Sequence, residues 1–397
     1  ALLGSGGRVL YTRALVGSLA ITIAIHVAAY MLNAVLPFHA TALGATGSQV
    51  GLLFSVTAGV AMFLRPVVGG WVDRHGARAV LAPGVAVLAL TSLGFHTAAT
   101  PGALIALMAG VGLANGLIST AAGVLAAQAT APVHRGEALG IYYLGTSLAV
   151  AVAAPAGIAL LRWRGITWAF GLVTALAALI LVFTLLLTPR SPAGVVGRAS
   201  GFRLWSRHAL GAAAVMVLIT LGQSSIIGFV PLYAEAHGLG SWIGWFFGLY
   251  SAWMILCRAV LRGLSDHVGR VQVIAPAIVA TTLGFLVLAW PPSGPSLLVA
   301  ALLLGSGASL TYPTMIALLV DRAPEQERGL AMGTLSASWD VGVVIGSVLV
   351  GVVIEGISFH AGFAVGAAGA CAGLLTFVLL ERARARRPAY PRPAAAV

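Results

Sequence analysis

The chain has 397 residues, of which 59% are hydrophobic and only 8% are charged. Soluble globular domains carry about 25% charged residues, so this composition excludes a water-soluble globule and indicates that lipid surrounds most of the chain. The net charge of +12 needs no nucleic-acid partner, and we expect none, because the positions of the basic residues explain it.

Twelve apolar stretches of about 20 to 26 residues follow one another along the chain. Each one, as a helix rising about 1.5 Å per residue, can cross a hydrocarbon core of about 30 Å. They predict an all-α integral membrane protein with twelve transmembrane helices. The predicted spans are 12–37, 47–70, 78–97, 102–128, 136–160, 166–188, 208–233, 242–263, 271–290, 295–320, 328–354 and 359–381.

The basic residues, all of them arginine, favour one side of the predicted membrane. Seventeen of the 22 lie in the tails and in every second loop, whereas only Arg162 and Arg164 lie in the alternate loops. Cytoplasmic loops carry the excess of basic residues, so both termini are predicted to be cytoplasmic. We expect a multi-pass protein of the inner (plasma) membrane. The seventeen are Arg8, Arg13, Arg74, Arg78, Arg135, Arg190, Arg198, Arg203, Arg207, Arg270, Arg322, Arg328, Arg382, Arg384, Arg386, Arg387 and Arg392.

Two segments repeat each other at a distance of half the chain. Residues 65–76 and 258–269 share Arg, Val, Gly, Asp and Gly in one register, and the same offset relates 135–136 to 328–329. A duplication in so apolar a chain is typical of transporters built from two related bundles. We therefore expect two pseudo-symmetric six-helix bundles, residues 1–187 and 209–397. Residues 188–208, rich in Arg, Pro, Gly and Ser, form the predicted cytoplasmic linker.

The six-plus-six arrangement and the sequence GGWVDRHGAR at residues 69–78 resemble the major facilitator superfamily over essentially the whole chain. Ala77 departs from the family's loop pattern, and the second copy departs further, with Arg262 for Gly69 and His267 for Arg74. Residues 154–157 (APAG) partly resemble the Gly-Pro element of the twelve-helix drug:proton antiporter branch. The resemblance implies transport by alternating access between the two bundles.

The resemblance also implies a cytoplasmic gate. The Asp73 loop is expected to contact the start of the eleventh span near Arg328 and to hold that side shut in the outward-facing state. Gly69 and Gly70 would let helices approach closely, and Gly76 would permit a tight turn. The alternative is a solvated loop carboxylate. The predicted gate residues are Gly69, Asp73, Arg74, Gly76, Arg78, Asp266 and Arg328.

Two arginines lie inside predicted spans. Arg65 is eight residues before Asp73, about 12 Å into the membrane, and Arg258 is its equivalent in the second half. A charge at that depth is costly and is normally kept for function or paired. The pair could recognise an anion or neutralise an acid. Alternatively, both side chains could extend to the membrane surface and bind backbone carbonyls.

One carboxylate lies deep in a span. Asp340 follows Arg328 by twelve residues, about 18 Å along a helix, which places it near the membrane midplane. Burial disfavours the charged form of Asp340 there, and a group that binds and releases a proton during transport requires such an environment. Alternatively, Asp340 stays ionised, pairs with Arg65 or Arg258, and only holds helices together. Its first-half counterpart is Ser147.

A central cavity is predicted from polar and aromatic side chains. His26, Tyr30 and Asn33 share one helix face by their spacing. His26 could relay protons, although it could equally be a neutral hydrogen-bonded residue. As a group, the aromatic residues favour a sizeable apolar substrate. The predicted cavity residues are His26, Tyr30, Asn33, Arg65, Asn115, Tyr142, Tyr143, Gln223, Tyr250, Trp253, Arg258, Tyr312 and Trp339.

Three functions compete on the sequence alone. The first is a proton-coupled exporter of small, largely apolar molecules, with Asp340 and His26 as proton-coupling residues. The second is a proton symporter that imports an organic anion recognised by Arg65 and Arg258. The third is a non-transporting receptor or membrane enzyme, although the sequence offers no matched nucleophile, nucleotide loop or metal-ligand cluster. We expect a monomer with no metal or cofactor, driven by the proton gradient.

Overall fold

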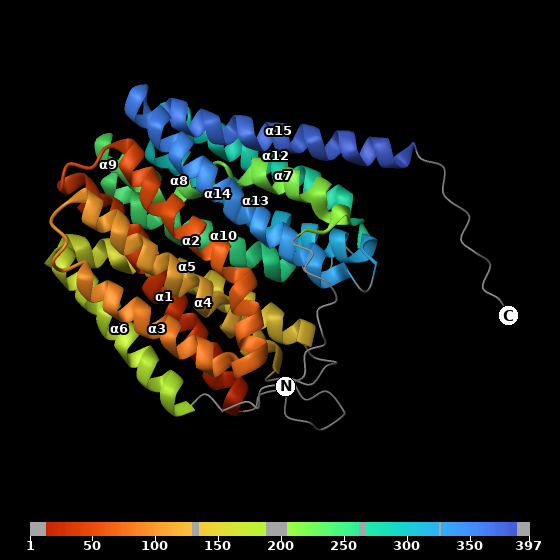
Figure 1. The fold of residues 1–397 in the computed structure, drawn as a ribbon. Helices are drawn as coiled ribbons and strands as arrows, with labels where there is room; N and C mark the ends of the chain where they lie inside the picture. Colours follow the sequence, from red (N-terminus) through yellow and green to blue (C-terminus); the bar gives the residue numbers. More distant parts are fainter. Residues whose placement is uncertain (1–12, 129–134, 188–204, 262–266, 325–326, 387–397) are drawn as a thin grey trace.

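The computed structural model describes residues 13–128, 135–187, 205–261, 267–324 and 327–386, and every regular element in these ranges is a helix (Figure 1). This confirms the all-α prediction. The first half contains six long helices. They are α1 (Arg13–Ala42), α2 (Gly47–His75), α3 (Ala77–Gly94), α4 (Pro101–Gln128), α5 (Arg135–Arg164) and α6 (Ile166–Leu187).

The described part of the second half contains five long helices and one interrupted segment. The long helices are α10 (Ile243–Val260), α12 (Arg270–Leu288), α13 (Gly294–Arg322), α14 (Arg328–Gly356) and α15 (Phe359–Ala385). The interrupted segment is η2 (Arg207–Ala209), α7 (Leu210–Thr220), α8 (Gln223–Gly228) and α9 (Val230–Ala236), and η3 (Gly240–Trp242) leads into α10. Eleven segments of the described chain are long and apolar enough to cross a membrane.

The structure corrects the expectation of one uninterrupted helix over 208–233. The first break follows Thr220, where a Cβ on Gly222 would lie 2.6 Å from the ring of Phe285 and 2.8 Å from Gly366. The second precedes α9, whose first turn contains Pro231 and therefore lacks one backbone donor. Interrupted helices are typical of binding sites in secondary transporters.

Helix packing repeats between the halves, as the duplication predicts. In the first half, α1 packs on α5 and α6, α2 on α4, and α3 on α4 and α6. In the second half the equivalent pairs are α7 with α14 and α15, α10 with α13, and α12 with α13 and α15. The halves meet mainly through two equivalent contacts, α2 with α14 and α5 with α10. The packing is therefore that of two pseudo-symmetric six-helix bundles.

The apolar cores show that the halves touch mainly at one end. We call the side where α1 begins and α15 ends the terminal side, and the opposite side, which carries α9, the far side (Figure 1). The largest core joins both halves and includes Phe54 and Phe246. Two further cores stay within one half each, between Ile21 and Ile180 and between Ala209 and Phe377. The bundles thus share a core toward the far side and have separate cores toward the terminal side.

Candidate functional site

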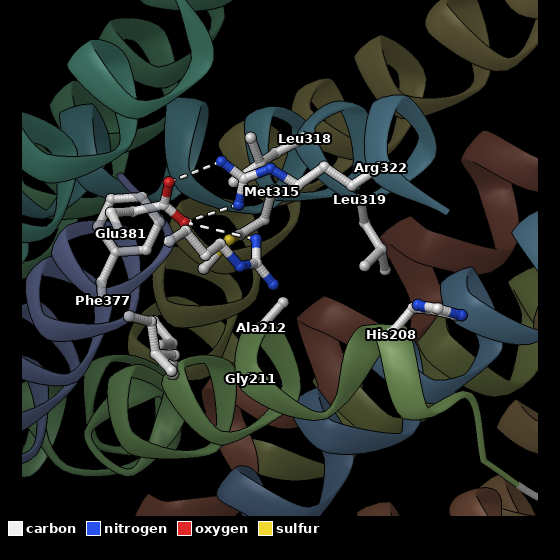
Figure 2. A pocket seen from close by; sticks show the side chains of 12 residues that line it. His208, Gly211, Ala212, Met315, Leu318, Leu319, Arg322, Phe377 and Glu381 are labelled. Atoms are coloured by element: carbon white, nitrogen blue, oxygen red, sulfur yellow. Dashed lines mark hydrogen bonds and ion pairs between the residues drawn. The ribbon is translucent and has the colours of Figure 1, made fainter. Parts of the chain in front are cut away.

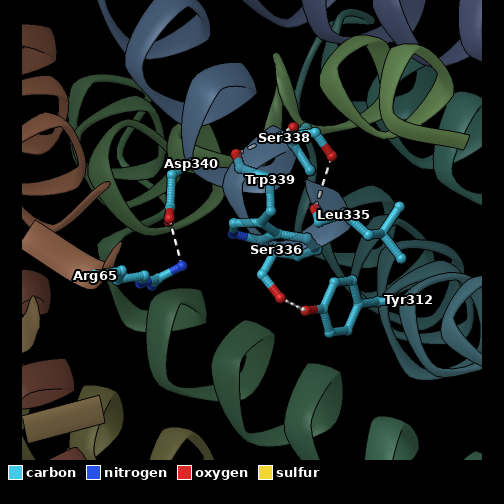
Figure 3. A network of polar contacts seen from close by, with 8 residues as sticks. Arg65, Tyr312, Leu335, Ser336, Ser338, Trp339 and Asp340 are labelled. Carbon is cyan, nitrogen blue, oxygen red and sulfur yellow. Dashed lines mark hydrogen bonds and ion pairs between the residues drawn. The ribbon is translucent and has the colours of Figure 1, made fainter. Parts of the chain in front are cut away.

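An ion pair joins the two halves deep within the helices. Arg65 Nη1 on α2 contacts Asp340 Oδ2 on α14 (Figure 3). The Asp340 residue is 6% exposed, while the Arg65 side chain is about one-third exposed. The sequence left open whether Asp340 pairs with Arg65 or with Arg258, and in the structure it pairs with Arg65. Charges at this depth are costly unless they are paired, so each residue stabilises the other there.

Toward the far side, α2 and α14 cross in close contact through small residues. A Cβ on Gly351 would lie 2.5 Å from the Gly47 carbonyl oxygen. A Cβ on Gly51 would overlap the Ser347 carbonyl oxygen. The four-residue spacing of small residues on each helix lets the two backbones approach, as in other membrane helix pairs.

Toward the terminal side, the same two helices separate. A Cβ on Gly59 would still lie 3.7 Å from Val344, in ordinary van der Waals contact. Beyond the ion pair, Gly70 on α2 and Gly329 and Gly333 on α14 have no heavy atom of the described residues within 4 Å of the Cβ position, apart from their own helix. Within the described part of the structure, the ion pair therefore lies where the halves begin to diverge, and the helices are separated toward the terminal side.

Two polar contacts between the halves reinforce the closed far side. The backbone N–H of Ser48, in the first turn of α2, donates to Glu355 Oε2 on α14 at 2.9 Å. Arg162 on α5 donates to Glu235 Oε2 on α9 at 2.8 Å. A carboxylate at a helix N-terminus is favoured by the helix dipole and by the unpaired N–H groups there. We call these contacts of α2 with α14 and of α5 with α9 the far-side gate. The sequence analysis did not predict it, although the four-residue spacing of Gly47 and Gly51 is typical of closely packed membrane helices.

Aromatic residues predicted for the cavity gather in the second half, beside Asp340. The rings of Tyr312 and Trp339 pack edge to face at 5.3 Å, and the Tyr312 hydroxyl is hydrogen bonded to Ser336 at 2.9 Å (Figure 3). Tyr312, Trp339, Gln223 and Thr311 help to line a small pocket between α7, α8, α12, α13 and α14. Thr311 Oγ1 is buried there without a hydrogen-bond partner among the described residues.

A second polar cluster contains Arg258. Arg258 lies close enough to Tyr30 on α1 and to Tyr250 on α10 for an electrostatic interaction, and Tyr250 lies close to the Gln223 side chain. His26 stacks on Tyr30 with ring centroids 6.3 Å apart. The structure therefore brings together five predicted cavity residues from both halves.

Other predicted cavity residues are dispersed. Trp253 Nε1 donates to Ser306 at 2.7 Å, within the second half. Asn33 is partly buried on α1 and Asn115 is exposed on α4. The side chains of Tyr142 and Tyr143 lie outside the described part of the structure.

The predicted gate is only partly described. Gly76 has a φ of +81° at the junction of α2 and α3, which confirms the tight turn, and Arg78 donates to the Leu185 carbonyl oxygen. Arg74 and Arg328 are exposed. Gly70 makes no close helix contact in this open conformation, contrary to expectation. The surroundings of Gly69, the side chain of Asp73 and residue Asp266 lie outside the description, so the latch stays a prediction.

A further pocket lies at the terminal side of the second half, between α7, α13 and α15 (Figure 2). Arg322 on α13 donates two hydrogen bonds of 2.6 Å to the two carboxylate oxygens of Glu381 on α15. Arg384 lies 3.6 Å from the same carboxylate. Sequence reasoning did not single out this clamp, because its partners are 59 residues apart and belong to no repeat.

The Major Facilitator Superfamily model matches residues 19–294 and 212–396, so the chain belongs to this superfamily of transporters. It is similar to the staphylopine export protein of Staphylococcus aureus, at 22% identity over 92% of this chain and 94% of the relative. It is also similar to a homologue of the multi-drug resistance efflux pump PmrA from Lactococcus lactis, at 26% identity over 82% of this chain and 84% of the relative.

Among solved structures, the fold is similar to that of the human organic anion transporter MFSD10 (TETRAN). The TM-score is 0.66 at 18% identity, over 92% of this chain and 99% of that chain. The chain is thus a membrane transporter of this fold and not an enzyme.

Proposed function

We propose that this transporter is a proton-coupled exporter of small, largely apolar molecules, working by alternating access. The Arg65–Asp340 ion pair carries the proposal. It connects α2 to α14 at the point where the two halves diverge, and it contains a buried carboxylate. A proton that binds this carboxylate changes a contact on which the arrangement of the halves depends.

The coupling follows from the energetics of a buried pair. When Asp340 is ionised, its attraction to Arg65 offsets the cost of burying both charges. A proton on Asp340 removes that attraction and leaves the Arg65 charge uncompensated, which favours movement of α2 relative to α14. His26 is the second proposed proton-coupling residue, because imidazole takes up and releases protons near neutral pH.

Two observations support export. Two relatives are named an export protein and an efflux pump. The arginine distribution predicts that the terminal side is cytoplasmic, so the open side of this conformation is the side from which an exporter binds its substrate. We accordingly place the protein in the plasma membrane as a monomer. Of the APAG segment, Gly157 packs closely on Met31 of α1, but this packing alone does not decide direction.

The test is transport by the purified chain in liposomes. An imposed proton gradient should drive transport of fluorescent lipophilic dyes in the wild type. Asp340→Asn should lose gradient-driven transport while it still exchanges dye across the membrane without a gradient. Ser336→Ala, four residues away on α14, is the matched control and should remain gradient-driven. If the gradient accelerates Asp340→Asn as much as the wild type, the coupling proposal is wrong.

Import of an organic anion is the second candidate, favoured by the placement of Arg258 beside Tyr30 and Tyr250. The name of the human structural neighbour, an organic anion transporter, is consistent with it. Cells that express the protein separate the candidates, because an anion importer increases the cellular content of a labelled carboxylate, whereas the proposed exporter decreases that of a lipophilic dye.

A further inference from the structure

The hairpin that joins α5 to α6 on the far side carries two arginines with different surroundings. Arg162 and Arg164 are the two arginines of the alternate loops, which the arginine distribution assigns to the non-cytoplasmic surface. Arg162 is bound to Glu235 at 2.8 Å in the far-side gate. Arg164 forms no ion pair with any residue that the structure describes. Its charge is therefore available to an anion from outside the chain.

Two tryptophans of the hairpin hold the Arg164 guanidinium. Its Cζ atom lies 4.3 Å from the ring centroid of Trp163 and 5.6 Å from that of Trp168. Both indole side chains are exposed. A guanidinium is attracted to the faces of aromatic rings, and its N–H groups point outward in the plane of the group. The rings therefore fix the position of the charge without neutralising it, and N–H groups stay available to an acceptor.

The first turn of α6 lies directly beside Arg164. Gly165 is the single residue between α5 and α6, with a φ of +87°, and its N–H donates to the Leu161 carbonyl oxygen at 2.9 Å. The first turn of a helix presents backbone N–H groups and the positive end of the helix dipole, which together favour anions such as phosphate. The arginine side chain and the start of α6 thus favour the same kind of group.

An apolar stripe of α6 continues from this charge into the membrane. Its members are exposed and follow one another every three or four residues, so they share one helix face. The opposite face of α6 packs on α1 and α3. The part from Trp168 to Leu179 extends about 17 Å, which is about one leaflet of the hydrocarbon core. The stripe consists of Trp168, Leu172, Ala175, Leu179, Val182 and Leu186.

We propose that the far-side end of the α5–α6 hairpin binds an anionic phospholipid of the surrounding leaflet. The lipid phosphate accepts hydrogen bonds from the Arg164 guanidinium, which matches phosphate oxygens with its planar N–H groups. An acyl chain lies along the exposed stripe of α6. A soluble phosphate compound would use only the charged part of this surface, whereas a phospholipid uses the charged and the apolar parts together.

The test uses the full-length chain in phosphatidylcholine nanodiscs that contain a photoreactive lipid. This lipid is phosphatidylglycerol or phosphatidylcholine with a diazirine in one acyl chain, and mass spectrometry maps the residues that each one labels. The exposed stripe of α12, with Val279, Leu283 and Leu286, is the internal reference. It ends near the exposed Trp290, but the one arginine of α12, Arg270, begins the helix at its other end.

Labelling should show a preference for the anionic lipid at α6. In the wild type, the ratio of phosphatidylglycerol to phosphatidylcholine labelling should be about fivefold higher on the α6 stripe than on the α12 stripe, as expected for one arginine near an anionic headgroup. Arg164→Gln should reduce the α6 ratio to that of α12. Arg164→Lys should keep part of the preference, because it keeps the charge but loses the planar N–H groups.

The matched control is Arg162→Gln/Glu235→Gln, which removes the neighbouring ion pair without changing the net charge, and it should label as the wild type does. Retained labelling of α6 by phosphatidylcholine shows that each variant is folded and inserted. Equal ratios on α6 and α12 in the wild type, or an unchanged ratio in Arg164→Gln, would overturn the inference. Competition by glycerophosphate as effective as that by unlabelled phosphatidylglycerol would also overturn it, since the surface would then bind soluble phosphates. Lipid labelling requires no transport, so either result leaves the proposed function to its own test.

Discussion

Gly51 of α2 lies against the backbone carbonyl of Ser347 on α14, with no room for a side chain between the two helices. This contact belongs to the closed far side. A larger residue at position 51 would have to push α2 and α14 apart, whereas the halves could remain separated on the terminal side without any change.

Gly51→Val should therefore open the far side. Spin labels on Thr97 and Ser241, two exposed far-side positions in different halves, should give a longer distance in the variant, measured in a background with Cys257 and Cys371 replaced by serine. Gly59→Val is the control, because a Cβ there makes only an ordinary contact. An unchanged distance in Gly51→Val would show that the crossing does not hold the far side closed.

Glu355→Gln should weaken the far-side contact between α2 and α14 less than Gly51→Val does. The glutamine can still accept the hydrogen bond from Ser48, but the negative charge at the N-terminus of α2 is lost. The helix dipole then no longer stabilises this contact, so the population with an open far side should rise. The Thr97–Ser241 distance distribution measures this population. Thr41→Val, which removes a hydroxyl bonded only within α1 among the described contacts, should leave it unchanged.

Removing both charges of the Arg65–Asp340 ion pair should distinguish the effect of the pair on stability from its effect on proton coupling. Arg65→Gln leaves a buried carboxylate without its partner, so it should lower the melting temperature more than the double variant Arg65→Gln/Asp340→Asn does. The double variant should recover stability without recovering gradient-driven transport. Melting curves and liposome transport on the same preparations decide this. Recovery of both properties would mean that the proton binds elsewhere.

Glu381→Gln should destabilise the second half. The carboxylate accepts two short hydrogen bonds from Arg322, and the Glu381 side chain is only 17% exposed. Because Arg322 is itself about one-third exposed, we expect a loss of about 1–2 kcal/mol in the free energy of unfolding. Arg384→Gln, whose contact is longer, should have a smaller effect. Denaturant unfolding in detergent measures both, and equal losses would contradict the assigned geometry.

The sequence was sufficient to predict the helices, because membrane-spanning segments are long and apolar and the duplication repeats their order. It could not predict the interruption after Thr220, where Phe285 and Gly366 lie close to Gly222. Residues that interact across the halves were equally hard to pair. The position of Asp340 deep in a span left its pairing with Arg65 or Arg258 open, and only the folded structure distinguishes the two.

The polar contacts of the far-side gate could not be predicted from the sequence either. Glu355 and Glu235 lie near span ends, where carboxylates are common and carry no obvious signal. Their partners, Ser48 and Arg162, are assigned only once α2 lies beside α14 and α5 beside α9. Long-range contacts of single polar residues leave no periodicity in the sequence.

The apolar core shared by both halves also sets the energy needed for turnover. Opening the far side exposes part of the surface around Phe54 and Phe246, at a cost of about 25 cal/mol for each Å² of apolar area. The separate cores of the terminal side carry no such cost, so the empty transporter should rest open toward that side. Substrate and proton must then supply the difference, and smaller side chains in the shared core should make the cycle faster but less tightly coupled.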